Sequence, residues 1–434
     1  MGEKVTIFGL WHLGCVTAAC LAELGYKVVG TDLDEKVVEE LSHGRPPIFE
    51  PKLEGLLKKH IERKNLTFYF DKGTALKDAD FIFITFDTKV DEQDQVDLGD
   101  IYQTANEIAK YIKNDSIVIV SSQVPVGTCS KIKEIILEKN KALKFDICYL
   151  PENLRLGDAI NSFLKPDRIV IGANNENTLE RVKKLFEPLK CEKITMSIES
   201  AEMTKHALNA YLATCISFIN EISDICELSK ASASDVVKAL KSDKRVGPYA
   251  PINPGLGFSG GTLARDVQVL RKYGDVSGYD TKFLDAVIEA NEKRKHFVFN
   301  RLEKLFGDVK SLQVGILGLT YKPGTDTLRR SLSLEIAKEL LSHGAIVKAY
   351  DPKIKSSISE LPELEVSKEI DDVAKGSDVL VLITEWPEFK ELQLEKIKTL
   401  MKKPIFIDTK NFLDQKNFKK LNFSYIGVGE SYET

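Results

Sequence analysis

The chain has 434 residues, of which 43% are hydrophobic and 29% are charged, and its formal net charge is −4. This length predicts two or three domains, each with enough apolar residues for a packed core. The small net charge excludes bulk attraction to nucleic acid or to an anionic membrane, so an anionic ligand must be held by local groups. No apolar run approaches the roughly 20 residues that span a bilayer, and the start of the chain lacks a signal-peptide pattern.

A strand–helix–strand pattern opens the chain, with strands expected at 5–9 and 28–32 and a helix at 15–24. This is the usual start of a doubly wound parallel sheet. Further strands alternate with helices up to about residue 195, and we expect them at 81–85, 116–121 and 148–150. Residues 1–195 are therefore predicted to form one α/β domain.

A long helical pattern without Gly or Pro follows from Glu199 to about Leu228. More helices continue through Arg301, and a Gly/Pro-rich loop at 247–262 interrupts them. A second α/β pattern starts at 312–317, with later strands at 346–350, 379–383, 405–407 and 425–428. The predicted fold class is α/β, with two Rossmann-like doubly wound lobes, 1–195 and 306–434, joined by a central helical segment, 196–305.

The two lobes form a weak internal repeat. Each begins with a strand followed by Gly-Leu, at Gly9 and at Gly318, and each places an acidic residue at the end of its second strand, at Asp32 and at Asp351. The repeat supports two lobes of similar topology.

The cysteines give no sign of a metal site or a disulfide framework. There are seven, with no CxxC pair and no metal-ligand spacing. Cys15 and Cys20 lie in an apolar, helix-like run. We expect reduced, structural cysteines, no metal, and a cytoplasmic protein.

The segment Gly9–Gly14 has the context of a dinucleotide-binding loop, because it follows a strand, opens a helix and precedes the acidic Asp32. Gly9 allows the tight turn, Gly14 allows close helix–strand packing, and the free N–H groups after Leu10 favour a pyrophosphate. Asp32 would accept hydrogen bonds from a ribose and repel a 2′-phosphate, which favours NAD over NADP. Trp11 replaces the second glycine of the pattern, so either its side chain points away or the dinucleotide sits differently; the alternative is a structural unit that has lost its ligand.

Residues 257–266 read Gly-Phe-Ser-Gly-Gly-Thr-Leu-Ala-Arg-Asp. This segment resembles the active-site signature of the UDP-glucose/GDP-mannose dehydrogenase family, roughly G-F-G-G-S-C-F-P-K-D, in which the Cys is the covalent nucleophile. Thr262 stands at the Cys position, Arg265 replaces the Lys and Asp266 is kept. The chain thus resembles a divergent family member that lacks the catalytic Cys, and the resemblance extends over essentially its whole length.

Other family motifs appear with substitutions: V-x-T-P as 86–89, S-T-V-P-V-G-T as 122–128, and N-P-E-F-L-x-E-G as 150–157. Thr88 is kept in the first, while Gln123 replaces the water-orienting Thr of the second. In the third, Glu152 is kept and Leu156 replaces the second Glu. The resemblance implies a cofactor contact for Thr88 and Gln123, a catalytic role for Glu152, and a substrate contact for Leu154.

Lys205 and Asn209 lie four residues apart, on one face of the long helix. They match the family's Lys and Asn, which polarise the substrate oxygen and bind the developing oxyanion. Without that match, such a helical pair is usually a solvated face.

The remaining matches concern the substrate and a second subunit. Residues 245–249 resemble the family's R-I-G segment, whose Arg reaches a partner subunit's substrate, and 318–331 resemble G-L-x-F-K-x-x-T-D-D-x-R-x-S. The resemblance implies a diphosphate contact for Lys322 and a cofactor contact for Arg329. The implied substrate-binding residues are Leu154, Arg245, Tyr249, Gly257, Phe258 and Lys322.

The resemblance implies an NAD-dependent enzyme that oxidises a nucleotide-diphosphate sugar at C6, forms at least a homodimer and serves polysaccharide biosynthesis. A Thr hydroxyl is far less acidic than a Cys thiol, whose pKa is ~8.5. The changes at Thr262, Gln123 and Leu156 all fall on the second, acyl-enzyme half of the reaction, so we expect a two-electron oxidation. The alternatives are a redox-neutral enzyme that keeps its NAD and a silent nucleotide-sugar-binding protein.

Overall fold

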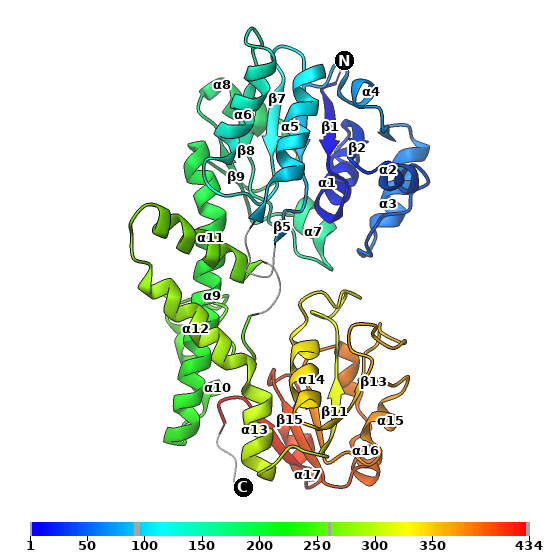
Figure 1. Cartoon of the computed structure of the whole chain (residues 1–434), viewed down its shortest axis with the longest axis vertical. Helices are drawn as coiled ribbons and strands as arrows, with labels where there is room; N and C mark the ends of the chain where they lie inside the picture. The colour runs from blue at the N-terminus through cyan, green and yellow to red at the C-terminus, as the bar shows by residue number, and fades with distance from the viewer. Residues whose placement is uncertain (1, 91–95, 259–261, 431–434) are drawn as a thin grey trace. The chain divides into compact units, whose positions relative to one another are not determined.

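The computed structural model describes residues 2–90, 96–258 and 262–430 (Figure 1). Its contacts divide the chain into two compact units, Met1–Leu208 and Asn209–Thr434. Each unit contains one parallel, Rossmann-like sheet, and helices lie between the two sheets in the sequence. This confirms the predicted fold class, while the three-part division at 195 and 305 stays a prediction.

The sheet of the first unit has the strand order β10-β9-β8-β7-β4-β1-β2-β3. Neighbouring strands run parallel except for β8 and β9. The strands are β1 (Lys4–Phe8), β2 (Lys27–Thr31), β3 (Leu66–Phe68), β4 (Phe81–Ile84), β7 (Ile117–Val120), β8 (Asp146–Tyr149), β9 (Arg168–Gly172) and β10 (Glu192–Met196). The order reverses between β1 and β4, and ligands of such sheets bind at the carboxyl ends of the strands beside this point.

The helices of this unit cover both faces of the sheet (Figure 1). They are α1 (His12–Glu23), α2 (Glu35–Ser42), α3 (Leu53–Glu62), α4 (Lys72–Leu76), α5 (Gly99–Tyr111), α6 (Thr128–Lys139), α7 (Ala159–Leu164) and α8 (Glu176–Leu185), and a short ribbon, β5 (Lys89–Val90) with β6 (Val96–Asp97), precedes α5. Successive residues of a strand face opposite sides of the sheet. Phe81 and Phe83 of β4 therefore pack in one core cluster, and Ile82 and Ile84 pack in another.

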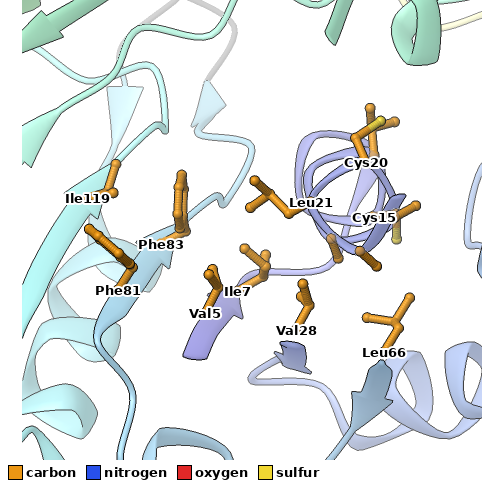
Figure 2. Packing of buried hydrophobic residues seen from close by; sticks show 14 of the residues in the cluster. Val5, Ile7, Cys15, Cys20, Leu21, Val28, Leu66, Phe81, Phe83 and Ile119 are labelled. Carbon is orange, nitrogen blue, oxygen red and sulfur yellow. The ribbon is translucent and has the colours of Figure 1, made fainter. Parts of the chain in front are cut away.

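The first of these clusters lies between the sheet and α1 (Figure 2). Leu21 of α1 points toward Ile7 and Phe83, and Cys15 and Cys20 are fully buried among apolar neighbours. This packing fixes the N-terminus of α1 at the carboxyl end of β1.

The helical middle of the chain starts with α9 (Ile198–Ser229), close to the expected 199–228. It continues with α10 (Ala233–Ser242), α11 (Leu263–Val276), α12 (Lys282–Lys295) and α13 (Phe297–Phe306). Among the described residues, no helix combines the length and the apolar character needed to cross a membrane.

The sheet of the second unit has the order β13-β12-β11-β14-β15-β16, and its neighbouring strands are all parallel. The strands are β11 (Gln313–Leu317), β12 (Ile346–Tyr350), β13 (Glu365–Val366), β14 (Val379–Leu382), β15 (Ile405–Asp408) and β16 (Ser424–Gly427). The helices are α14 (Leu332–Ser342), α15 (Ile370–Ala374), the 3₁₀ turn η1 (Pro387–Glu391), α16 (Leu394–Leu400) and α17 (Gln415–Lys420). Here the order reverses between β11 and β14.

Candidate active site

The glycines of the cofactor loop are required by close packing. Gly9 has φ +102°, and a Cβ on it would lie 2.8 Å from the backbone nitrogen of Phe86. A Cβ on Gly14 would lie 1.7 Å from the carbonyl oxygen of Gly9. The tight turn and the close helix–strand approach expected of this loop are both present.

Trp11 is the N-terminal cap of α1 and has φ −79°, an ordinary value for any residue. Its backbone therefore needs no glycine, and its indole is 44% exposed. Trp11 therefore differs from the glycine of the usual pattern only in the volume of its side chain.

Asp32 lies directly after β2 and is 8% exposed. One carboxylate oxygen accepts a hydrogen bond from the backbone N–H of Leu10, and the other accepts one from the N–H of Asp34. Burial raises the pKa of Asp32, and these backbone donors partly offset the rise. A carboxylate held at the mouth of the glycine turn fits a ribose hydroxyl, so the residues present fit NAD.

Two further cofactor candidates meet at the same end of the sheet. The hydroxyl of Thr88, after β4, donates to the carbonyl oxygen of Gln123, after β7, at 2.9 Å. Both residues are buried. Because Phe86 packs against Gly9, the loops after β1, β4 and β7 converge there.

Lys205 and Glu152 form an ion pair in which the lysine is buried and the carboxylate side chain is 19% exposed. The Nζ of Lys205 lies 2.9 Å from Oε1 of Glu152 and donates to its carbonyl oxygen at 2.8 Å. The other carboxylate oxygen accepts the N–H of Leu154 at 2.9 Å. Lys205 is 6% exposed, which rules out the solvated-face interpretation of this helix position.

Asn209 and Asp266 form a second buried pair, within the other unit. The side-chain amide of Asn209 donates to Oδ2 of Asp266, which is fully buried in the first turn of α11. The N–H of Asp266 bonds the carbonyl oxygen of Thr262 at 3.2 Å, whereas Thr262 itself is exposed. Residues 259–261 of the signature lie outside the described residues.

The second unit has a cavity of about 570 Å³ at the carboxyl ends of β11 and β14, the reversal point of its sheet. It brings together three predicted substrate residues, Gly257, Phe258 and Lys322, and a fourth residue, Lys410, that was not predicted. Two lysines suit a diphosphate. The walls also include Asn253, Thr320, Ser331, Ser333 and Asn411.

Three predicted residues lie apart from these clusters. Tyr249 is 96% exposed, and Arg329 is also exposed. The side chain of Arg245 is 90% exposed and pairs with Asp243 at 2.8 Å. The structure assigns Arg245 and Tyr249 to the surface of the second unit.

Several buried polar residues near the candidate site were missed. Glu202, fully buried on α9, accepts the N–H groups of Gly127 and Cys129 at 2.7 and 2.9 Å and so caps α6. The only signal in the sequence is that Glu202 precedes Lys205 by one helical turn. Glu50 was not predicted as a site residue, and its side-chain contacts could not be foreseen, because all of them are distant in sequence.

The second lobe also has an acidic residue at the end of its second strand, but groups of the protein itself bond its carboxylate. Asp351 is fully buried and accepts the N–H groups of Leu319, at 2.7 Å, and Thr320, at 3.0 Å. The indole N–H of Trp386 donates to the same oxygen at 3.1 Å. The indole of Trp386 thus takes up a hydrogen bond to the acidic residue that corresponds to Asp32.

Three domain descriptions of one family match the chain in order. The NAD binding domain of the UDP-glucose/GDP-mannose dehydrogenase family matches residues 3–190, its central domain 199–293 and its UDP binding domain 315–415. The chain is 36% identical over 432 residues to UDP-glucose 6-dehydrogenase of Rickettsia conorii, which covers 98% of this chain and 99% of that one. It is 34% identical over 430 residues to UDP-glucose 6-dehydrogenase TuaD of Bacillus subtilis, covering 98% and 93%.

Solved structures of two nucleotide-sugar dehydrogenases have the same fold as this chain. The structure of a UDP-glucose dehydrogenase from Pyrobaculum islandicum superimposes with a TM-score of 0.91 at 29% identity, covering 99% of this chain and 98% of that one. A UDP-D-ManNAc dehydrogenase from Pyrococcus horikoshii shares the fold, with a TM-score of 0.86 at 24% identity over 98% and 99% of the two chains. The chain therefore belongs to the UDP-glucose/GDP-mannose dehydrogenase family and is an NAD-dependent nucleotide-sugar dehydrogenase that acts on a CH–OH group.

Proposed function

We propose that this protein oxidises C6 of UDP-glucose with NAD. The names of its relatives and the matched UDP binding domain support this substrate. The structural observation that best supports the proposal is the cavity of the second unit. There Lys322 and Lys410 lie among hydrogen-bonding side chains, as a diphosphate requires. The oxidised nucleotide sugar would then enter polysaccharide biosynthesis.

We propose the catalytic roles from the Lys205–Glu152 and Asn209–Asp266 pairs. Glu152 receives the hydroxyl proton through a water, and Lys205 and Asn209 donate hydrogen bonds to the alkoxide oxygen that this proton leaves, from which the carbonyl forms as hydride departs from C6. Asp266 orients the amide of Asn209 through their hydrogen bond. NAD, when bound, supplies the hydride acceptor.

The cofactor roles are proposed for the converging loops of the first unit. The glycine turn and the first N–H groups of α1 would hold the pyrophosphate, Asp32 the ribose, and Thr88 with Gln123 the far end of the dinucleotide. Arg329, exposed on the second unit, is proposed as a further cofactor contact.

We propose further that the reaction stops after one hydride transfer. The alcohol loses a hydride to NAD and a proton to the solvent, which leaves an aldehyde at C6. A second transfer through a covalent intermediate needs an activated nucleophile at position 262. Asp266, one helical turn after Thr262, is a poor activating base for this hydroxyl, because its carboxylate is buried and bonded to Asn209.

Product analysis tests this proposal. With UDP-glucose and NAD we expect one NADH per sugar and an aldehyde, or slow acid formation through the hydrated aldehyde, with no acyl-enzyme in the protein mass spectrum. Efficient uronic acid formation with two NADH per sugar would refute the two-electron reaction. Thr262→Cys is the matched variant: if Thr262 alone stops the second step, the Cys variant traps or passes a thiohemiacetal.

The second-unit surface supports a homodimer. Tyr211, Phe218 and Ile225 follow one another at intervals of seven residues on α9 and are 57%, 49% and 52% exposed. Leu228, three residues on, is 85% exposed. A heptad stripe of this kind suits packing against a second helix. We propose that α9 pairs with its copy and that Arg245 and Tyr249 reach the partner's substrate.

Two further proposals complete the assignment. We propose three domains, with boundaries near 195 and 305, because the matched domain descriptions fall on either side of these positions. We propose a cytoplasmic location because all seven cysteines are free thiols.

A further inference from the structure

The buried carboxylate of Glu50 joins three segments of the first unit. Its side chain has no exposed surface. Oε1 accepts the N–H of Ala159, the first residue of α7, at 2.9 Å. Oε2 accepts the N–H of Gly157 at 2.9 Å and lies 2.8 Å from Nε2 of His12.

The two groups that share Oε2 belong to the two functional parts of this unit. His12 is the first residue of α1 and directly follows the glycine turn that would hold the cofactor. Gly157, with φ +85°, ends the loop that carries Glu152. A single carboxylate oxygen therefore ties the cofactor turn to the end of the catalytic loop.

The chemistry of this contact defines the donor. A carboxylate that is buried with its charge can only accept, so Nε2 of His12 carries the proton. A neutral imidazole and an imidazolium make the same bond, so the link does not depend on protonation of the ring. Loss of the donor would leave a buried, charged acceptor short of one partner, which is costly.

The catalytic loop is held independently at its two ends. Glu152 is fixed by Lys205 and by the N–H of Leu154, and Gly157 is fixed by Glu50. Loss of the His12 donor would therefore loosen the far end of the loop while the Lys205–Glu152 pair stays in place.

We propose that His12 is a positioning residue that couples cofactor binding to the placement of the catalytic loop. A dinucleotide bound at the N-terminus of α1 restricts the backbone of His12. The His12 side chain and the N–H of Gly157 both bond Glu50, so Gly157 is restricted as well. The inference rests on the proposed function, since it takes NAD and UDP-glucose as ligands. Its consequence is reciprocal: each ligand tightens the binding of the other by the same factor.

Calorimetry with NADH and UDP-glucose, a pair that does not react, measures this coupling. In the wild-type protein, saturating NADH should lower the Kd of UDP-glucose by about fivefold or more. His12→Phe and His12→Asn should abolish this factor, because neither side chain carries a donor that reaches Glu50. His12→Gln should restore it, because its amide N–H can take the place of Nε2–H.

The controls separate the possible failures. His43→Phe, at an exposed histidine after α2, should leave the coupling unchanged. If the Phe and Asn variants keep the wild-type factor, or if the Gln variant folds without restoring it, the role of His12 is overturned. Binding of both ligands to the wild-type protein without mutual effect would overturn the inference and leave the proposed function standing. Failure of the wild-type protein to bind NADH would overturn both.

Discussion

Asp32 should determine which dinucleotide the protein accepts. Asp32→Ala removes hydrogen bonds to a charged group, each worth about 1.5–3 kcal/mol, so the Kd for NAD should rise by roughly tenfold or more. NADP should be affected much less, since the same carboxylate repels its 2′-phosphate. Fluorescence titration with both cofactors measures the difference. Glu35→Ala, at an exposed carboxylate nearby, is the control, and equal losses for the two cofactors would rule out the ribose contact.

Trp11 should weaken the cofactor site through the volume of its side chain. Its backbone is unstrained and its indole is exposed, so Trp11→Gly removes little packing. Glycine is also accepted at helix N-caps. We expect the Kd for NAD to fall in this variant while the thermal midpoint changes little. An unchanged Kd would show that the indole already points away from the dinucleotide.

From the sequence we could choose single candidate residues of the site but not the contacts between them. Lys205 and Asn209 could be chosen because they match a motif and lie one turn apart on a helix. Glu152 and Asp266 were also chosen from motifs, but their contacts with Lys205 and Asn209 could not be predicted, because the paired residues are 53 and 57 residues apart along the chain and folding alone brings them together. Lys410 was missed for the same reason: its place in the cavity depends on the parallel pairing of β15 with β14.

Among the elements, the buried cap of α6 should be a measurable source of stability. Glu202 satisfies two N–H groups at the start of that helix, where a negative charge is also favoured by the helix dipole. Glu202→Gln keeps only one acceptor oxygen and should lower the free energy of unfolding by about 1–3 kcal/mol in a urea titration. Glu199→Gln, at an exposed residue in the first turn of α9, should change the free energy of unfolding by only a few tenths of the loss expected for Glu202→Gln. A loss no larger than that of the control would show that Glu202 does not act as the cap.

Two of the strands that were not predicted, β10 and β13, share a physical cause, whereas β9 was missed although its residues 169–172 are buried. β10 has no fully buried residue, and β13 has two residues at the edge of its sheet, so neither shows the apolar run by which buried strands are recognised. Central strands such as β4 and β7 are buried throughout and were predicted to within one or two residues. The helix α1 begins at His12, three residues before the apolar run at Cys15, because the glycine turn sets its start.

For the whole molecule, we expect a dimer in solution. The exposed stripe on α9 offers apolar area that burial against a second copy would remove from water. Light scattering at micromolar concentration should give twice the chain mass of 48.6 kDa, and Phe218→Lys should shift the protein toward monomer. Arg245→Ala should raise the KM for UDP-glucose without changing the mass. A monomeric wild-type protein would contradict a dimer interface at the α9 stripe. Arg245 would then act within its own subunit.

The filled acidic position of the second lobe has a consequence for how the enzyme behaves in a cell. Because the indole of Trp386 bonds the carboxylate of Asp351, we expect the second lobe to lack the ribose contact that we propose for Asp32 in the first lobe. We therefore expect cofactor and substrate to bind different lobes even though both are nucleotides. Rising NAD should then saturate the enzyme without the self-inhibition that two interchangeable nucleotide sites would produce.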